Sequence, residues 1–387
     1  MTAGLVRPDP LEVAAGQMLG AHDVVVDRPR VERGGVRAAL ERQLIVAVQH
    51  DPCVVSFSGG RDSSALLALA ADVARREGLP LPVAATLEFV GLSEADERSW
   101  QELVLRSVGI ADWQRVVVPD GDLDFVGPTA LRLLRTHGVV FPSNAHAHVP
   151  LAELGRGGSL VCGAGGDEVF GSPAEHLVRV LRGRARPRVA DARSIRQRLS
   201  RSYPIALGTA AVGDRHWLRP AALVAAVERE GRAQAALGMR WGRALQRWAH
   251  SRYRRASVST LRILGEDHGV HVVAPFLTDG VLAAVAADGG VAGYASRTDV
   301  LRSIVGELLP SAAVERTSKA TFTGAFFGPH SRALVEGWDG TGVIDELVDA
   351  TRVAAELRRA LPDGRTSMLL QTLALQRDRS TLMPPER

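Results

Sequence analysis

Between residues 53 and 162, short runs of β-forming residues alternate with longer segments that have the apolar spacing of helices. Strands are predicted at residues 53–57, 83–89, 114–118 and 159–162, and helices at 31–49, 63–77, 94–107, 124–137 and 144–155. Strands separated by helices of this length form βαβ units with right-handed crossovers. We therefore expect an α/β fold, in which a parallel sheet with helices on both faces is followed by a mostly helical C-terminal lobe.

This pattern divides the chain into three parts. Residues 1–30 are interrupted by three prolines and are predicted to form an N-terminal extension. Residues 31–172 are predicted to form the α/β core, and residues 173–387 a helical lobe that completes the same domain. No segment approaches the roughly 18 apolar residues that span a bilayer, and the first residues lack the order of a signal peptide. We therefore expect a cytoplasmic protein that does not contact a membrane.

The first predicted strand runs through a serine- and glycine-rich loop directly into a helix. Two adjacent glycines let the backbone approach an anion, and the first amides of the helix point toward it. Three serine hydroxyls add donors, and the carboxylate of Asp62 suits a magnesium ion that arrives with phosphates. The predicted phosphate-binding residues are Ser58, Gly59, Gly60, Asp62, Ser63 and Ser64. A plain βα turn with Asp62 as helix cap is the simpler alternative.

A second glycine-rich loop follows the predicted strand at 159–162. Its glycines Gly163, Gly165 and Gly166 are predicted to lie against the same phosphates. Because the carboxyl ends of parallel strands meet at one edge of a sheet, we expect Asp167 to lie near Asp62 and to share a magnesium ion with it. The alternative is a turn in which Asp167 and Glu168 begin a helix.

Lys319 is the only lysine in a chain whose other basic side chains, histidines aside, are all arginines. An ammonium group is a compact point charge, whereas a guanidinium group is a planar fork. Because the chain uses arginine at the other positions of this kind, the lysine at position 319 indicates that this position does not tolerate an arginine.

The two loops together resemble the synthetase domain of the asparagine synthetase family, within the ATP pyrophosphatase, or PP-loop, superfamily. Asp96-Glu97, the segment 274–279 (Ala-Pro-Phe-Leu-Thr-Asp) and the segment 308–319, which ends in Arg-Thr-Ser-Lys, also resemble this family. The resemblance extends from about residue 31 to about residue 330. It implies an adenine nucleotide α-hydrolase-like fold, ATP and Mg²⁺ as cofactors, and cleavage of ATP between its α and β phosphates. It further implies catalytic roles for Asp62, Asp167 and Lys319.

The sequence departs from the family in the parts that serve the amine. Family members that use glutamine have a catalytic cysteine after the initiator methionine, where this chain has Thr2. Ala164 occupies the position of a glutamate in asparagine synthetases and of a tyrosine in β-lactam-forming relatives, and residues 271–273 replace the usual Glu-x-Arg. The second loop is similar to that of lasso-peptide cyclases. The proton acceptor for the amine stays open between Glu168, His271 and water.

We therefore expect an ATP-dependent, AMP-forming amide ligase that adenylates an aspartate or glutamate side chain, free or in a peptide, and transfers it to an amine. A specialised or peptide substrate, as in lasso-peptide-type macrolactam formation, is favoured. The alternatives are asparagine synthesis with ammonia or a separate amidotransferase, a tRNA-modifying PP-loop enzyme, and a non-catalytic ATP-fold binding protein. Cys53 and Cys162 are predicted to be buried core residues, which disfavours the tRNA-thiolating alternative.

The segment Arg179–Arg201 is rich in arginine. Such a run is typical of a solvated face or a mobile loop, and its alternative is a docking surface for an acidic peptide or a carrier. Two features disfavour nucleic acid as a partner: the net charge is only +4, and the arginine-rich run contains no interleaved aromatic residue until Tyr203.

Overall fold

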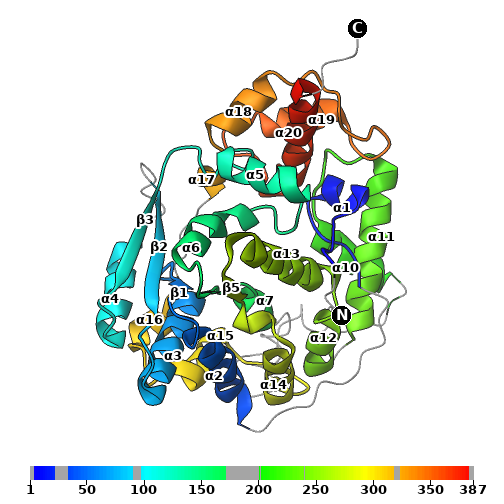
Figure 1. Ribbon diagram of the computed structural model, residues 1–387. Coiled ribbons are helices and arrows are strands. Elements are labelled where there is room, and N and C mark those ends of the chain that lie inside the picture. Colours follow the sequence, from blue (N-terminus) through cyan, green and yellow to red (C-terminus); the bar gives the residue numbers. More distant parts are fainter. Residues whose placement is uncertain are drawn as a thin grey trace.

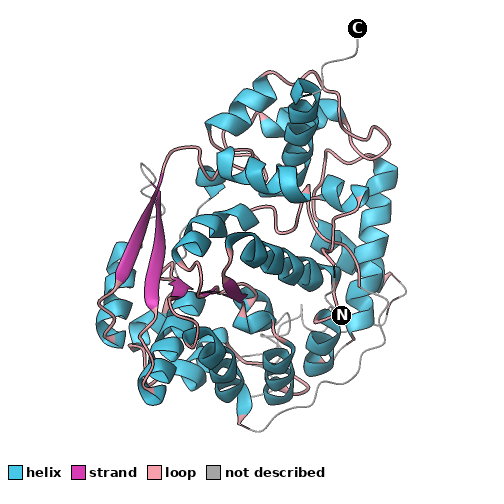
Figure 2. Ribbon diagram, viewed as in Figure 1, coloured by secondary structure: helices cyan, strands magenta, loops and turns pink. Residues whose placement is uncertain are grey.

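A computed structural model describes residues 4–21, 34–89, 97–170, 200, 202–238, 240–317 and 323–382. Its core contains a five-stranded sheet in the order β3-β2-β1-β4-β5, with every neighbouring pair parallel. The strands, magenta in Figure 2, lie among helices. The strands are β1 (Cys53–Ser56), β2 (Val83–Phe89), β3 (Trp113–Val118), β4 (Ser159–Val161) and β5 (His271–Val273). The predicted α/β fold with a parallel sheet and a helical part is confirmed.

The central strand β1 is apolar because it is covered on both faces, as strands of parallel sheets usually are. Cys53 and Val55 point into one hydrophobic cluster, and Val54 points into another on the opposite face. The first cluster packs against α2, α3, α4, α14, α15 and α16, and the second against α6 and α13.

The helices of the core on the first face are α2 (Gly35–Val48), α3 (Arg61–Glu77), α4 (Arg98–Val108), α14 (Asp279–Gly289), α15 (Arg297–Val305) and α16 (Ser311–Glu315). On the second face lie α6 (Val149–Leu154) and α13 (Arg252–His268). The shorter elements include α5 (Pro128–His137), α7 (Gly166–Phe170), η2 (Ala145–His148) and η3 (Pro275–Leu277).

A second hydrophobic core lies beside the sheet and is built from helices at both ends of the chain (Figure 1). Its helices are α1 (Pro10–Ala15), α11 (Pro220–Leu237), α18 (Pro329–Glu336), α19 (Ala350–Leu357) and α20 (Ser367–Leu382). The helices α10 (Tyr203–Val212), α12 (Trp241–Trp248), α17 (Thr323–Phe326) and η4 (Gly364–Thr366) adjoin it or connect it to the rest. Helix α1 packs against α11 and α20, so the described part of the predicted extension belongs to this lobe.

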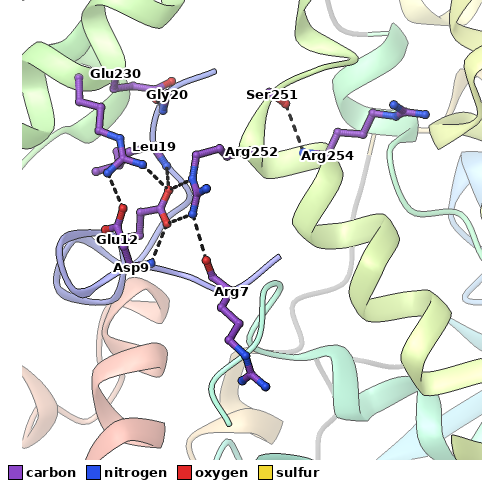
Figure 3. A network of polar contacts seen from close by, with 10 residues as sticks. Arg7, Asp9, Glu12, Leu19, Gly20, Glu230, Ser251, Arg252 and Arg254 are labelled. Atoms are coloured by element: carbon purple, nitrogen blue, oxygen red, sulfur yellow. Dashed lines mark hydrogen bonds and ion pairs between the residues drawn. The ribbon is translucent and has the colours of Figure 1, made fainter. Parts of the chain in front are cut away.

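The buried carboxylate of Glu12 joins α1 to two distant helices (Figure 3). Its oxygens accept hydrogen bonds from Nε and Nη2 of Arg252 at 2.6 and 2.7 Å, and from Nη2 of Arg229 at 3.1 Å. The backbone N–H of Leu19 donates a further bond at 2.9 Å. Since Arg229 belongs to α11 and Arg252 is the first residue of α13, this network connects the helical lobe to the sheet-bearing core.

The core does not end where the sequence pattern places its boundary, at residue 172. Strand β5 and the helices α13 to α16 come from the part predicted to be a helical lobe, and they complete the sheet and its two layers. Strand β5 has three residues, as β4 does, but no glycine-rich loop follows it to mark it, and it acquires its conformation by pairing with β4. None of the helices in the described ranges is long and apolar enough to cross a membrane.

Candidate active site

A cleft of about 380 Å³ opens at the carboxyl ends of β1 and β4. Its lining includes Ser58, Asp62, Gly163, Asp167, Arg297 and Arg316. The two loops singled out in the sequence therefore face each other across one cavity, at the edge of the sheet where parallel α/β folds bind ligands.

The first loop is held in shape by its own serines. The Ser58 and Ser63 hydroxyls lie 3.1 Å apart, and Ser63 also donates to the Gly60 carbonyl at 3.1 Å. Gly59 adopts a positive φ of 81°, and a Cβ there would lie 2.9 Å from the Gln101 side chain. Glycine is therefore required at this turn.

Most of the predicted loop residues reach the cleft. The lining includes Ser58 and Gly60 from the loop. It also includes Asp62 and Ser63, which belong to the first turn of helix α3, since this helix begins at Arg61. Ser64 is buried at 1% exposure and is not among the lining residues. The first turn of α3, which borders the cleft, and the loop hydroxyls form a site suited to an anion such as a phosphate.

The carboxylates of Asp62 and Asp167 converge on one guanidinium group. Arg297, the first residue of α15, donates through Nη2 to Asp62 and through Nη1 to Asp167. Burial raises the pKa of the Asp62 carboxyl, although Arg297 acts in the opposite direction. Arg297 thus occupies the position between the two acids that the sequence assigned to a magnesium ion.

The residues at this point fit a magnesium ion that is bound together with phosphates. Oδ1 of Asp62 is buried and has no hydrogen-bond partner among the described residues, which leave this carboxylate oxygen unsatisfied. Magnesium is commonly held by one or two carboxylates plus substrate phosphates. No cluster of three or more potential metal-binding side chains occurs in the described ranges.

The glycines of the second loop allow the two loops to approach each other. A Cβ on Gly166 would lie 2.4 Å from Oδ2 of Asp62, and one on Gly165 would lie 2.4 Å from the Leu277 side chain. Gly163 lines the cleft, whereas Gly165 and Gly166 do not. Two of the three glycines predicted to contact phosphates are therefore positioned for loop packing.

The side chain of Arg316, which forms a buried ion pair, connects the segment 308–319 to the first loop. Arg316, only 6% exposed, pairs with Glu97 and donates to the Gly59 carbonyl at 2.9 Å. Its guanidinium lies 4.9 Å from the centre of the Trp100 ring. Thr317, the next residue, lines the cleft, whereas Lys319 and Asp96 lie outside the described residues.

The two predicted proton acceptors lie away from the cleft lining. Glu168 accepts a hydrogen bond from the Tyr253 hydroxyl, whose pKa is raised by burial and by the Glu168 charge. His271 begins β5, at the opposite edge of the sheet from the two loops, and its ring lies 5.1 Å from that of His50. The structure therefore does not bring His271 to the cleft.

Sequence reasoning missed two cleft residues, Arg297 and His148. Neither belongs to a motif, and each reaches the site only because its helix packs against the core. His148 lies at the junction of η2 and α6 and lines the cleft together with Ala164. Burial lowers the pKa of its imidazole to about 4, and nearby His146 acts in the same direction.

A second cavity of about 570 Å³ lies at the carboxyl ends of β2 and β3. It is lined by the ends of these strands, at Phe89 and Val118, and by α17 and α18 with Arg332 and Glu336. Both cavities therefore open on the same edge of the sheet.

The two cysteines are core residues. Cys53 and Cys162 are free thiols and are buried, and burial raises the pKa of each to about 11. The arginine-rich segment predicted as a docking surface lies outside the described residues, apart from Ser200.

The sequence matches one protein-family model, described as asparagine synthase, over residues 33–377. A search of curated proteins found no match to the chain.

Proposed function

The chain belongs to the asparagine synthase family, whose members are ATP-dependent carbon–nitrogen ligases, and from this premise we propose an AMP-forming amide ligase that adenylates a carboxylate. The observation that carries the proposal is the convergence of Asp62 and Asp167 on Arg297, beside the phosphate loop. Asp62 and Asp167 follow different strands yet share one partly buried guanidinium group, and such a concentration of opposite charges in a cleft is typical of a functional site.

In the proposed first step, the substrate carboxylate attacks the α-phosphorus of ATP and pyrophosphate leaves. The Ser58 and Ser63 hydroxyls and the first amides of α3 would bind the leaving phosphates. Asp62 and Asp167 would hold magnesium, whose charge neutralises that of the pyrophosphate. Arg297 would then transfer its contacts from the acids to phosphate oxygens, and Lys319 would add a second positive charge.

In the proposed second step, an amine attacks the carbonyl carbon of the acyl-adenylate and AMP leaves. Ala164 cannot accept the proton that the amine must lose, so this half-reaction differs from that of a glutamate-bearing enzyme. The second cavity, which is larger than the cleft, supports a substrate bulkier than free aspartate. We therefore propose a specialised or peptide carboxylate, as in macrolactam formation, in preference to asparagine synthesis.

The buried cysteines oppose the tRNA-thiolation alternative. A thiol with a pKa of about 11 is almost entirely protonated at neutral pH, and the thiolate is the reactive form. The acid pair with its unsatisfied oxygen likewise opposes a scaffold that has lost catalysis, because such a costly arrangement would have no use there.

The test is AMP release and pyrophosphate exchange into ATP, measured over a panel of amino acids and acidic peptides. With an accepted carboxylate, Asp62→Asn and Lys319→Ala should lower both rates by about 100-fold or more. Asp112→Asn, at the far end of β3, serves as the matched control and should retain the wild-type rate. Wild-type rates in both site variants would contradict the assignment of the site. Failure of the wild-type protein to exchange pyrophosphate with any carboxylate of the panel would contradict the ligase proposal.

A further inference from the structure

The amine half-reaction needs a proton acceptor, and the position that supplies one in related enzymes holds Ala164. An amine that forms an amide bond must lose a proton as its nitrogen becomes bonded to carbon. A positioned side chain accelerates such a transfer only if it lies within hydrogen-bond reach of that nitrogen. The acceptor must therefore be one of the side chains that face the cleft.

Four side chains that line the cleft within the described ranges can accept a proton at neutral pH: Asp62, Glu97, His148 and Asp167. The three carboxylates are each paired with an arginine, since Arg297 contacts Asp62 and Asp167, and Arg316 contacts Glu97. The imidazole of His148 makes no hydrogen bond or ion pair with any described residue. Its nitrogens are therefore available to a ligand in the cleft.

The fold holds this ring at the boundary between the two loops. His148 immediately precedes α6, and α6 packs against β1 and β4, the strands that lead into the first and second loops. His148 and Ala164 therefore line the same cleft, and the altered position at residue 164 contributes no functional group to it.

We infer that His148 is the proton acceptor of the amine half-reaction. It would take over, from another element of the fold, the role of the functional group that is missing at Ala164. This assignment rests on the proposed ligase function. The amine nitrogen forms a bond to the acyl carbon, and the bond from that carbon to the adenylate oxygen breaks. AMP leaves with the electron pair, and the proton of the amine moves to the imidazole and then to solvent.

The protonation state of the ring is compatible with this role. Because burial lowers its pKa to about 4, the imidazole is neutral at physiological pH and can accept a proton. The negative phosphate of a bound adenylate would raise that pKa, since a nearby opposite charge favours the imidazolium form. The ring would thus become more basic when the intermediate is present.

The test separates the two half-reactions in His148→Gln and His148→Ala. With the carboxylate that supports pyrophosphate exchange in the wild-type protein, both variants should exchange at close to the wild-type rate. Formation of amide from ammonium chloride or a primary amine should fall by about 100-fold or more. Added imidazole should partly restore amide formation in His148→Ala, which a purely structural role would not allow.

His271→Gln is the matched control, because it removes a histidine from the opposite edge of the same sheet. It should retain both half-reactions. Amide formation at the wild-type rate in His148→Gln would overturn the assignment, and so would an equal loss of exchange and amide formation. If the wild-type protein failed to exchange pyrophosphate with every carboxylate of the panel, the ligase proposal would be contradicted, and this inference with it.

Discussion

Arg297 contacts both acids that the site would offer to a metal ion, so the free protein neutralises its own metal site. A divalent ion can enter only if the guanidinium leaves, and the guanidinium loses two ionic contacts unless a phosphate replaces them. In the proposed function, this would make metal binding dependent on the nucleotide. It also explains how a half-buried acid pair is tolerated when no ligand is present.

Arg297→Gln should therefore bind Mn²⁺ without ATP at least about tenfold more tightly than the wild-type protein, because a positive charge within contact distance is removed. Electron paramagnetic resonance of free Mn²⁺ measures this directly. Arg302→Gln, on the exposed side of the same helix, should behave as the wild-type protein does. Equal Mn²⁺ affinity in all three proteins would show that Arg297 does not control the site.

Gly166 is the residue that lets the second loop pass Asp62. In Gly166→Ala the added Cβ would lie 2.4 Å from Oδ2 of Asp62, so either the carboxylate or the loop must shift. Pyrophosphate exchange should fall by about 100-fold or more while the fold is retained, since misplaced catalytic groups lose much of their effect. Gly280→Ala, where a Cβ meets no atom within 4 Å, should leave exchange unchanged. An active Gly166→Ala would mean that Asp62 is not held where the structure shows it.

At the scale of the elements, the Glu12 network positions the start of α13, and α13 carries both Arg252 and Tyr253, the partner of Glu168. Helix α1 thus acts through a buried carboxylate on a helix that packs behind the site. Because Glu12 is fully buried, its removal leaves Arg229 and Arg252 without the carboxylate that they share. Arg229 then keeps its pair with Asp9, and Arg252 its hydrogen bond to the Arg7 carbonyl.

Glu12→Gln should lower the free energy of unfolding by about 3 to 5 kcal/mol, the cost typical of breaking a buried ion pair on one side. Urea denaturation measures the change. Glu228→Gln removes an exposed pair with Arg232 and should cost less than about 1 kcal/mol. A similar small loss in Glu12→Gln would mean that the network contributes little to stability.

The elements that local sequence reveals are those with a long pattern. The first four strands and the helices between them repeat two periodicities over many residues, and the glycines and acids of the two loops follow strands directly. Strand β5 and the Arg297 contact could not be found in this way. No glycine-rich loop follows β5 to mark it, as one follows the equally short β4, and the Arg297 contact joins residues that meet only because α15 packs on α3.

At the scale of the whole molecule, the buried histidines make stability depend on pH. The pKa of His148 is about 4 in the folded protein and about 6.5 when unfolded, so between these values only the unfolded chain binds the proton. The contribution is absent above pH 6.5, and the folded state loses up to about 3 kcal/mol as the pH falls from 6.5 to 4. Burial lowers the pKa of His146 as well, with the same sign.

His148→Gln should therefore lose less stability than the wild-type protein on acidification over this window. The comparison requires urea denaturation of both proteins at pH 7.0 and pH 5.0. The carboxylates that titrate in acid are common to both proteins and cancel in the difference. Parallel losses would mean that the pKa of the ring is not lowered in the folded protein.

The sheet also has a consequence for the order in which the chain can fold during synthesis. Strand β4 is complete at residue 161, but its outer neighbour β5 begins only at residue 271. Until the ribosome has delivered those residues, β4 has an open edge with unpaired backbone groups beside an apolar core. Such edges pair readily with other chains. The half-synthesised protein is therefore the form most exposed to aggregation, and the form on which a chaperone would have the greatest effect.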